Sequence, residues 1–238
     1  NLRFWRNTSI ATLGSGQTAT LTPNSLGYEW DWQQFDSSYP SRRILLSTTL
    51  FNSRTHHLSL YRHDSGALVF GAGTVQWSWG LDSNHDRGSD APSPDMQQAT
   101  VNLFADMGAA PITLQAGLVS ATASSDTQAP ASVIGFPLNG ASVSSGSQVN
   151  IQGTASDTGG GVVAGVEVSV DGGATWHAAT GTTTWSYAWT PGAQGSVTIK
   201  SRAFDDTGNL EVPTGPANVI SVTVTAPAPP SCPCTVFQ

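Results

Sequence analysis

The sequence is poor in charge, and above all in lysine. Charged residues make up 11% of its 238 residues, where about 25% is ordinary for a globular domain. Lys200 is the single lysine, and the formal net charge is -7 at pH 7. No cluster of Lys and Arg is available to neutralise phosphates or anionic lipid headgroups. We therefore expect no nucleic acid and no acidic membrane surface among the partners.

Long hydrophobic runs and paired cysteines are also lacking. No stretch approaches the roughly 18 apolar residues of a membrane span, so no span is expected. The two cysteines, Cys232 and Cys234, are separated by one proline. A disulfide between such close neighbours is strained, and a tetrahedral zinc site needs two further ligands. We expect them to pair with residues beyond the C-terminus.

Small and turn-forming residues are abundant instead, with 25 Gly and 14 Pro. This composition is typical of a mostly β, extracellular protein. The length suits two domains of about 100 to 120 residues each. Aromatic residues disappear between residues 117 and 132, where Ser, Thr, Ala and Pro take over. We therefore predict domains at 1–117 and 131–226, joined by a linker at 118–130.

The second half shows repeated alternation of apolar and polar residues. The alternating stretches are 148–155, 163–170, 183–190, 196–205 and 217–225. Clusters of Gly, Pro, Asn and Asp separate them, a pattern that predicts an all-β immunoglobulin-like sandwich. The Pro-rich segment 227–238 predicts an extended linker into a further domain.

The first half is less regular. Residues 43–51, 57–63 and 66–79 have the composition of strands, and residues 95–109 have helical periodicity. Pro94 suits the first turn of that helix, and Gly108 suits its end. Strands followed by one helix predict the closing part of an α/β domain that begins upstream.

Three stretches carry a resemblance to a known family: "LGYEWD", "HLSLYRHDSGALVFGAGTVQWSWGLD" and "MQQATVNLFADMGAAP". They resemble the C-terminal part of the family related to the large (beta) subunit of N,N-dimethylformamidase. The resemblance implies a glutamine-amidotransferase-like α/β fold over residues 1–117, of which this chain holds the closing part. It also implies amide hydrolysis at an iron held by tyrosines and a glutamate. Glu29 matches the glutamate, whereas no tyrosine can be matched.

The remainder of the chain resembles modules found beside that family. Residues 130–226 resemble the bacterial Ig-like domains of large secreted multidomain proteins, and "CPCTVF" resembles the opening of another module. The segment "SVDGGATW" (169–176) resembles the Asp-box hairpin of sialidases. Asp171 is expected to accept backbone amides there, Gly173 to supply a positive φ, and Trp176 to cover the turn. Its expected role is structural.

Two acidic stretches are candidate metal sites. Glu29 and Asp31 would project to one side of a strand, either as ligands or acid and base, or as a solvated strand end. Asp82, Asn84 and Asp86 alternate as the early ligands of a calcium loop do. However, the expected glycine comes one place late and a serine replaces the final glutamate, so a polar turn is the alternative.

Two aromatic sets are candidate glycan-binding surfaces. Trp77 and Trp79 would share one side of a strand, as would Trp185, Tyr187 and Trp189. Rings in such a row either stack on sugars or fill a core. We expect both sets to be buried. A helix follows Trp79 and needs a sheet to cover, and the residues that alternate with Trp185, Tyr187 and Trp189 are small.

These observations predict a structural or interaction segment of a large secreted or cell-surface bacterial protein, in a matrix, filament or surface assembly. Its expected partners are neighbouring domains of the same chain or identical copies. The alternatives are a remnant of a metal-dependent amide hydrolase, with iron or calcium as the cofactor, and a carbohydrate-binding module. The sequence contains no nucleophile elbow, phosphate loop or zinc signature, so catalysis by this segment is not expected.

Overall fold

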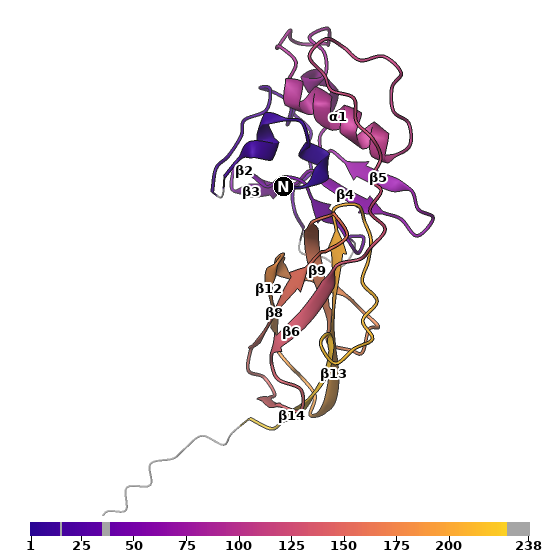
Figure 1. The fold of residues 1–238 in the computed structure, drawn as a ribbon. Coiled ribbons are helices and arrows are strands. Elements are labelled where there is room, and N and C mark those ends of the chain that lie inside the picture. Colours follow the sequence, from indigo (N-terminus) through magenta and orange to yellow (C-terminus); the bar gives the residue numbers. More distant parts are fainter. Residues whose placement is uncertain (15, 35–38, 228–238) are drawn as a thin grey trace, which may run out of the picture. The chain divides into compact units, whose positions relative to one another are not determined.

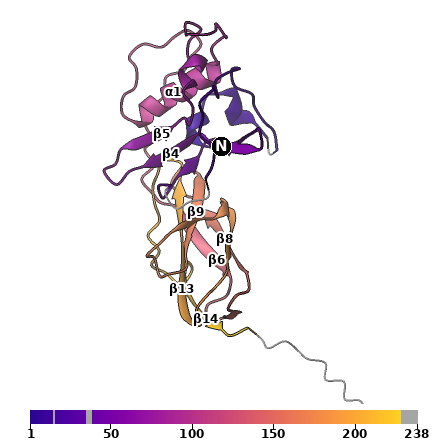
Figure 2. The same cartoon turned by 180° about the vertical axis from the view of Figure 1, so that it is seen from behind.

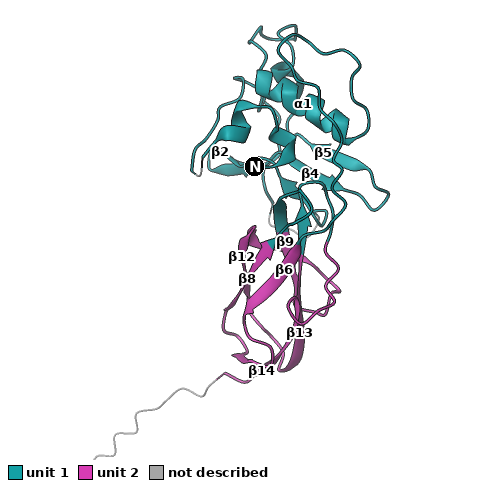
Figure 3. Cartoon of the chain, in the orientation of Figure 1, with its two compact units in different colours: residues 1–130, 156–165, 203–210 teal, residues 131–155, 166–202, 211–238 magenta. Residues whose placement is uncertain are grey.

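The structure is a computed structural model that describes residues 1–14, 16–34 and 39–227. These form two compact units, shown in Figure 3. The first unit comprises the described residues of 1–130, 156–165 and 203–210, and the second comprises those of 131–155, 166–202 and 211–227. The predicted linker beyond residue 227, with Cys232 and Cys234, lies outside the described residues. Within the described ranges, no helix is long and apolar enough to cross a membrane.

The first unit is built from short strands, three 3-10 turns and one α-helix (Figures 1 and 2). Its elements are η1 (Arg3–Trp5), η2 (Ser9–Thr12), β1 (Ile44–Leu45), β2 (Thr49–Phe51), β3 (Arg54–His56), β4 (Ser59–Arg62), β5 (Leu68–Gly71), η3 (Trp77–Gly80) and α1 (Pro94–Asp106). Strands β1, β4 and β5 form one antiparallel sheet, in that order, and β2 pairs with β3. Asn52 and Ser53 both have positive φ, which gives the β2–β3 hairpin a tight two-residue turn.

Two of the predicted strands in this unit are wrong in extent. The predicted strand 43–51 is divided, because β1 pairs with β4 whereas β2 pairs with β3. The predicted strand 66–79 ends at Gly71, and Trp77–Gly80 is a 3-10 turn. Gly73 has a φ of 60° between them, a conformation that leaves the strand region.

The predicted helix is confirmed. Ser93 caps its N-terminus by accepting the Met96 N–H at 3.3 Å, and Pro94 occupies the first turn. Gly108 follows the end with a φ of 75°, as helix termination commonly requires.

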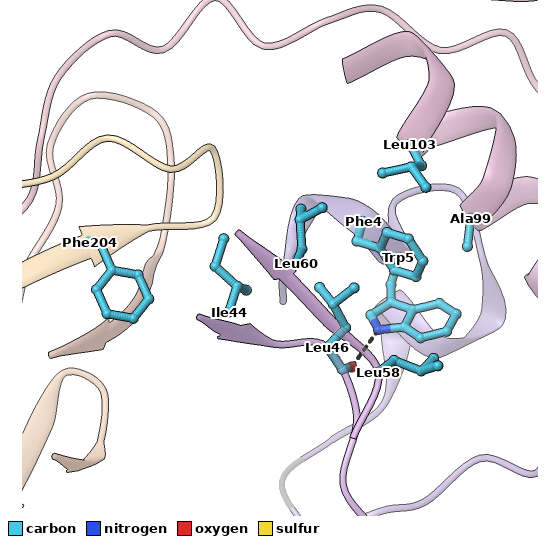
Figure 4. Close-up of a cluster of buried hydrophobic side chains, with 9 residues drawn as sticks. All are labelled: Phe4, Trp5, Ile44, Leu46, Leu58, Leu60, Ala99, Leu103 and Phe204. Carbon is cyan, nitrogen blue, oxygen red and sulfur yellow. Dashed lines mark hydrogen bonds between the residues drawn. The ribbon is translucent and has the colours of Figure 1, made fainter. Parts of the chain in front are cut away.

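The core of the first unit is formed by α1, η1 and the β1–β4–β5 sheet, and Phe204 extends it on the side of Ile44, away from the α1 residues (Figure 4). Its buried side chains are Phe4, Trp5, Ile44, Leu46, Leu58, Leu60, Ala99, Leu103 and Phe204. The Trp5 indole donates to the Leu46 carbonyl at 2.8 Å, so even this large ring leaves no polar atom unpaired.

The second half of the chain forms the predicted sandwich. Its strands are β6 (Ala131–Phe136), β7 (Ser142–Ser144), β8 (Val149–Ser156), β9 (Val163–Ser169), β10 (His177–Ala178), β11 (Thr180–Gly181), β12 (Thr184–Trp189), β13 (Gly195–Asp205) and β14 (Val219–Thr225). One sheet has the order β10-β9-β13-β14-β7 and the other β11-β12-β8-β6. Alternate residues of β14 are buried, as the sequence pattern predicts for a strand that covers a core on one face.

Candidate functional site

A cleft of the first unit contains both acidic residues of the "GYEWD" stretch. It has a volume of about 920 Å³ and is lined by residues 28–32 and 72–75, together with Asn52 and Arg54. Backbone hydrogen bonds fix the positions of Glu29 and Asp31. The Val75 N–H donates to the Glu29 carbonyl at 3.2 Å, and the Asp31 N–H donates to the Gly73 carbonyl at 2.8 Å. The predicted strand is thus reduced to one isolated bridge, between Trp30 and Thr74.

Aromatic rings form part of the wall of this cleft. Trp30 makes edge contacts with Trp32 at 6.0 Å and with Phe51 at 5.8 Å between ring centroids. The Arg54 guanidinium lies 3.8 Å from the Trp32 ring centroid, within cation–π range. Trp32 is 40% exposed and Tyr28 is 60% exposed. The cleft therefore offers partly exposed rings, each with an arginine over one face, beside carboxylates, a combination suited to a ligand with an apolar face and hydroxyl groups.

His56 lies behind this wall, with its ring 6.2 Å from Trp30, and it is buried. Its Nε2 hydrogen-bonds the Ala72 carbonyl at 3.0 Å. Burial lowers the pKa of His56, because desolvation disfavours the charged ring. The neutral ring is a packing element of the cleft.

The two tyrosines nearest to Glu29 in the sequence make contacts with other groups. An iron centre made of tyrosines and a glutamate needs phenol oxygens close to the Glu29 carboxylate. Tyr28 is largely exposed and its ring lies under the Arg87 guanidinium at 4.7 Å. The Tyr39 hydroxyl accepts the Gln34 N–H at 2.8 Å. These contacts give no support to an iron centre at Glu29, and the iron assignment stays a prediction.

The Asp82 loop is an exposed polar turn. The Asp82 carboxylate accepts the Asn84 N–H at 2.7 Å, which is the geometry of an Asx turn. Asp86 lies 3.4 Å from the Arg87 guanidinium in an exposed pair. Asp82, Asn84 and Asp86 are all exposed, so their side chains do not surround a common buried point.

Trp77 and Trp79 lie on η3, not on a strand. Trp79 is buried and stacks on His85 with 4.3 Å between ring centroids. Trp77 is half-buried and packs edge-on against Phe70 at 5.3 Å. The Trp79 ring face is thus covered by His85, whereas Trp77 makes an edge contact and keeps part of its ring exposed.

Trp185, Tyr187 and Trp189 lie on β12, and they do not form an exposed strip. Trp185 is 2% exposed, and its indole donates to the Thr154 carbonyl at 3.0 Å. Tyr187 stacks on His177 with centroids 5.8 Å apart, and burial raises the pKa of its hydroxyl. Trp189 is half-buried. The set mainly packs the sandwich.

The segment 169–176 connects β9 to β10. Asp171 accepts hydrogen bonds from the Ser169 hydroxyl at 2.7 Å and from the N–H and hydroxyl of Thr175 at 2.9 and 2.6 Å. Gly173 has a φ of 107°, and the Trp176 ring lies 4.0 Å from the Arg202 guanidinium. These contacts close a turn and leave no carboxylate atom for a ligand.

One cluster was missed by the sequence analysis. Asp126, Asp157 and Asp205 lie 31 or more positions apart, and each places a carboxylate oxygen within 4.8 Å of the others. A weak signal is present in the sequence, since "SDT" occurs at 125–127 and again at 156–158, and "DDT" at 205–207. Only the fold shows that these repeats meet.

Topology and sequence together define a β-sandwich of the bacterial Ig class in the second half. Residues 130–201 match the bacterial Ig domain family, and residues 1–90 match the family described as N,N-dimethylformamidase beta subunit-like, C-terminal. Both predicted resemblances are thereby confirmed.

Solved structures similar to this chain include small β-sandwich modules. The fibronectin(III)-like modules of Clostridium thermocellum CbhA are 23% identical with a TM-score of 0.33, covering 40% of this chain and 94% of that one. The PKD domain of an M14-like peptidase from Thermoplasmatales archaeon SCGC AB-540-F20 is 13% identical with a TM-score of 0.30, covering 40% and 92%. A comparison with curated proteins found no match.

Proposed function

We propose that the chain is a structural and interaction segment of a large bacterial multidomain protein that is secreted or held at the cell surface. The observation that supports this most directly is a bacterial Ig sandwich that follows a second family region in one chain. Domains of this class are typical of surface multidomain proteins. The lysine-poor, Gly- and Pro-rich composition agrees with this proposal. Neighbouring domains of the same protein, or identical copies in an assembly, are the partners that we propose.

The proposal includes a finer description of the first half. Residues 1–117 would form the closing part of a glutamine-amidotransferase-like α/β domain. The family match over residues 1–90 supports this description. No tyrosine of this chain can be matched to the iron ligands of that family, which favours a structural use of this part over amide hydrolysis.

Surface accessibility tests the proposed location. Antibodies raised against the purified chain should label intact cells of the source bacterium or its extracellular matrix, and external protease should remove the signal. A cytoplasmic protein of the same cells serves as the control for lysis. A signal that appears only after lysis and fractionates with the cytosol would refute the proposal.

The cleft supports a second candidate function, the binding of a glycan. The exposed rings of Tyr28 and Trp32 beside Glu29 and Asp31 are the supporting observation, because sugar rings present an apolar face to aromatic side chains and hydroxyls to carboxylates. Trp32→Ala should abolish binding in a polysaccharide panel followed by tryptophan fluorescence and calorimetry. Phe104→Ala, an exposed change on α1, is the matched control. An unchanged signal across the panel for the parent chain rules this candidate out.

A further inference from the structure

The acidic cluster of the first unit joins three separate segments of the chain. Asp126 lies in the segment after α1, Asp157 directly after β8, and Asp205 at the last position of β13. All three belong to the first compact unit. Their carboxylate oxygens lie within 4.8 Å of one another, and Asp205 is fully buried.

Two oxygens of this cluster are buried and have no hydrogen-bond partner, Oδ2 of Asp126 and Oδ2 of Asp157. The Oδ1 atoms of the same residues are held in local turns, by the N–H groups of Gln128 and Gly159 at 2.9 Å each. Each carboxylate is thus fixed by one oxygen and presents the other, unpaired, to the interior. A buried carboxylate oxygen without a donor is strongly unfavourable until a cation, a bound water or a proton satisfies it, and a cation satisfies several converging carboxylates at once.

The two unpaired oxygens converge on one point next to Gly161. A Cβ placed on Gly161 would lie 2.6 Å from Asp126 Oδ2 and 3.0 Å from Asp157 Oδ2. The same point lies 3.3 Å from Oδ1 of Asp206, a fourth carboxylate. The glycine therefore leaves open a small space that is bounded by acidic oxygens and that any side chain would fill.

Asp205 is oriented toward the cluster by its own network. Its Oδ1 accepts the N–H and hydroxyl of Thr207 at 2.9 Å each and the Asn209 N–H at 2.8 Å, and its Oδ2 accepts the Asn209 amide at 2.8 Å. That amide also lies 3.3 Å from the Asp126 and Gln128 carbonyls. The network links the end of β13 to the Asp126 segment.

We propose that Asp126, Asp157 and Asp205 bind one Ca²⁺ ion. Three carboxylates in one place repel each other, and among the described residues none of the ion pairs involves any of them. Calcium takes oxygen ligands only, at about 2.3 to 2.6 Å, and two such ligands can lie up to about 5 Å apart across the ion. Its irregular, all-protein coordination suits three side chains from three loops better than the strict octahedron of Mg²⁺.

The experiment uses the whole chain, stripped with a chelator. Calcium titration by calorimetry should give one ion per chain. At a calcium concentration 100-fold above the dissociation constant, the Tm should rise by about 5 to 10 °C. Magnesium at the same concentration should give a smaller rise. Absence of calcium binding, or an equal or larger response to magnesium, would overturn the assignment.

Single substitutions locate the ion, because they should lower calcium affinity without lowering the Tm of the metal-free protein. Asp126→Asn and Asp157→Asn each keep the Oδ1 acceptor and remove one negative charge. Calcium affinity should fall at least 10-fold, whereas the Tm of the metal-free protein should stay equal or rise, because like charges are removed from a buried place. A merely structural carboxylate would instead lower the metal-free Tm.

Asp82→Asn, in the exposed turn, is the matched control and should bind calcium as the parent chain does. Gly161→Ala should also lose calcium binding, because its methyl group would fill the space that the ion needs. Calcium binding that survives both Asp126→Asn and Asp157→Asn, or that Asp82→Asn abolishes, would refute the site.

Discussion

At the scale of single residues, the sandwich core depends on a glycine opposite a tryptophan. Gly153 on β8 pairs with Trp185 on β12, and a Cβ on Gly153 would lie 2.1 Å from the Val133 carbonyl and 2.3 Å from the Trp185 ring. Neither a strand carbonyl nor a fully buried ring can move aside cheaply. Gly153→Ala should lower the free energy of unfolding in urea by about 2 to 3 kcal/mol. Gly192→Ala, with nothing within 4 Å of its Cβ, is the control. If Gly153→Ala lowered the unfolding free energy no more than Gly192→Ala does, steric crowding at Gly153 would be refuted.

Asp171 gives the stability of the chain a predictable dependence on pH. The hydroxyl of Ser169, and then the hydroxyl and N–H of Thr175, hold the pKa of Asp171 well below its usual range. Because the folded-state pKa lies below the unfolded value of about 3.9, the stabilisation is complete above that value and declines as pH falls toward the folded pKa. Asp171→Asn should therefore be less stable than the parent at about pH 7, and the gap should narrow below about pH 4.

Urea unfolding at several pH values measures this gap, with the exposed Asp82→Asn variant as the control. A gap that stays constant from neutral pH down to about pH 3 would mean that the turn does not depend on the carboxylate charge.

At the scale of the element, α1 ends on an acidic residue where its dipole favours a cation. Asp106 is nevertheless stabilised, since it accepts from Arg3 at 2.7 and 3.0 Å and from Arg6 at 2.9 and 3.1 Å. Its side chain is 13% exposed, so solvent screens these pairs only partly. Asp106→Asn should lower the unfolding free energy by about 1 to 2 kcal/mol, and less at high salt. Asp64→Asn removes the pair with Arg42, in which Asp64 is 83% exposed, and should cost much less.

Elements with local signals could be predicted from the sequence. The cap at Ser93 and Pro94 marks the start of α1, and the alternation in β14 reports burial on one face. The 3-10 turn at Trp77–Gly80 could not be predicted from the sequence, because two tryptophans two positions apart have the spacing of a strand. Their actual positions are decided by Phe70 and His85, which the pattern does not identify as contacts.

The candidate sites, too, could be predicted only where their residues are close together in the sequence. Glu29 and Asp31 are neighbours in sequence, and the structure does place both on one cleft. Asp126, Asp157 and Asp205 are distant in sequence, and no spacing rule connects them. A site whose residues are brought together only by the fold can be identified only once the three-dimensional structure is known.

At the scale of the whole molecule, the first compact unit is not continuous in sequence. The change in composition near residue 130 coincides with one of its limits, but residues 156–165 and 203–210 also belong to it. The latter segment supplies Phe204 to the core and the Thr207 carbonyl, which accepts from the Arg62 guanidinium at 2.7 Å. The stability of the first unit should therefore depend on residues 203–210, which lie more than 70 positions after residue 130.

Phe204→Ala tests this dependence. Phe204 is 4% exposed, and its ring lies 2.4 Å from the position of a Cβ on Gly165, so its removal leaves a cavity that the glycine cannot fill. The loss should be about 3 to 4 kcal/mol of unfolding free energy, with faster hydrogen exchange in α1, which shares this core. Phe136→Ala, at a 51% exposed site, should leave α1 unchanged. A fragment that ends at residue 130 provides a second test. The dependence is refuted if α1 exchanges equally slowly in both variants and this fragment unfolds at the same urea concentration as the whole chain. Residues 1–130 would then suffice for the unit, and its later segments would add nothing to its stability.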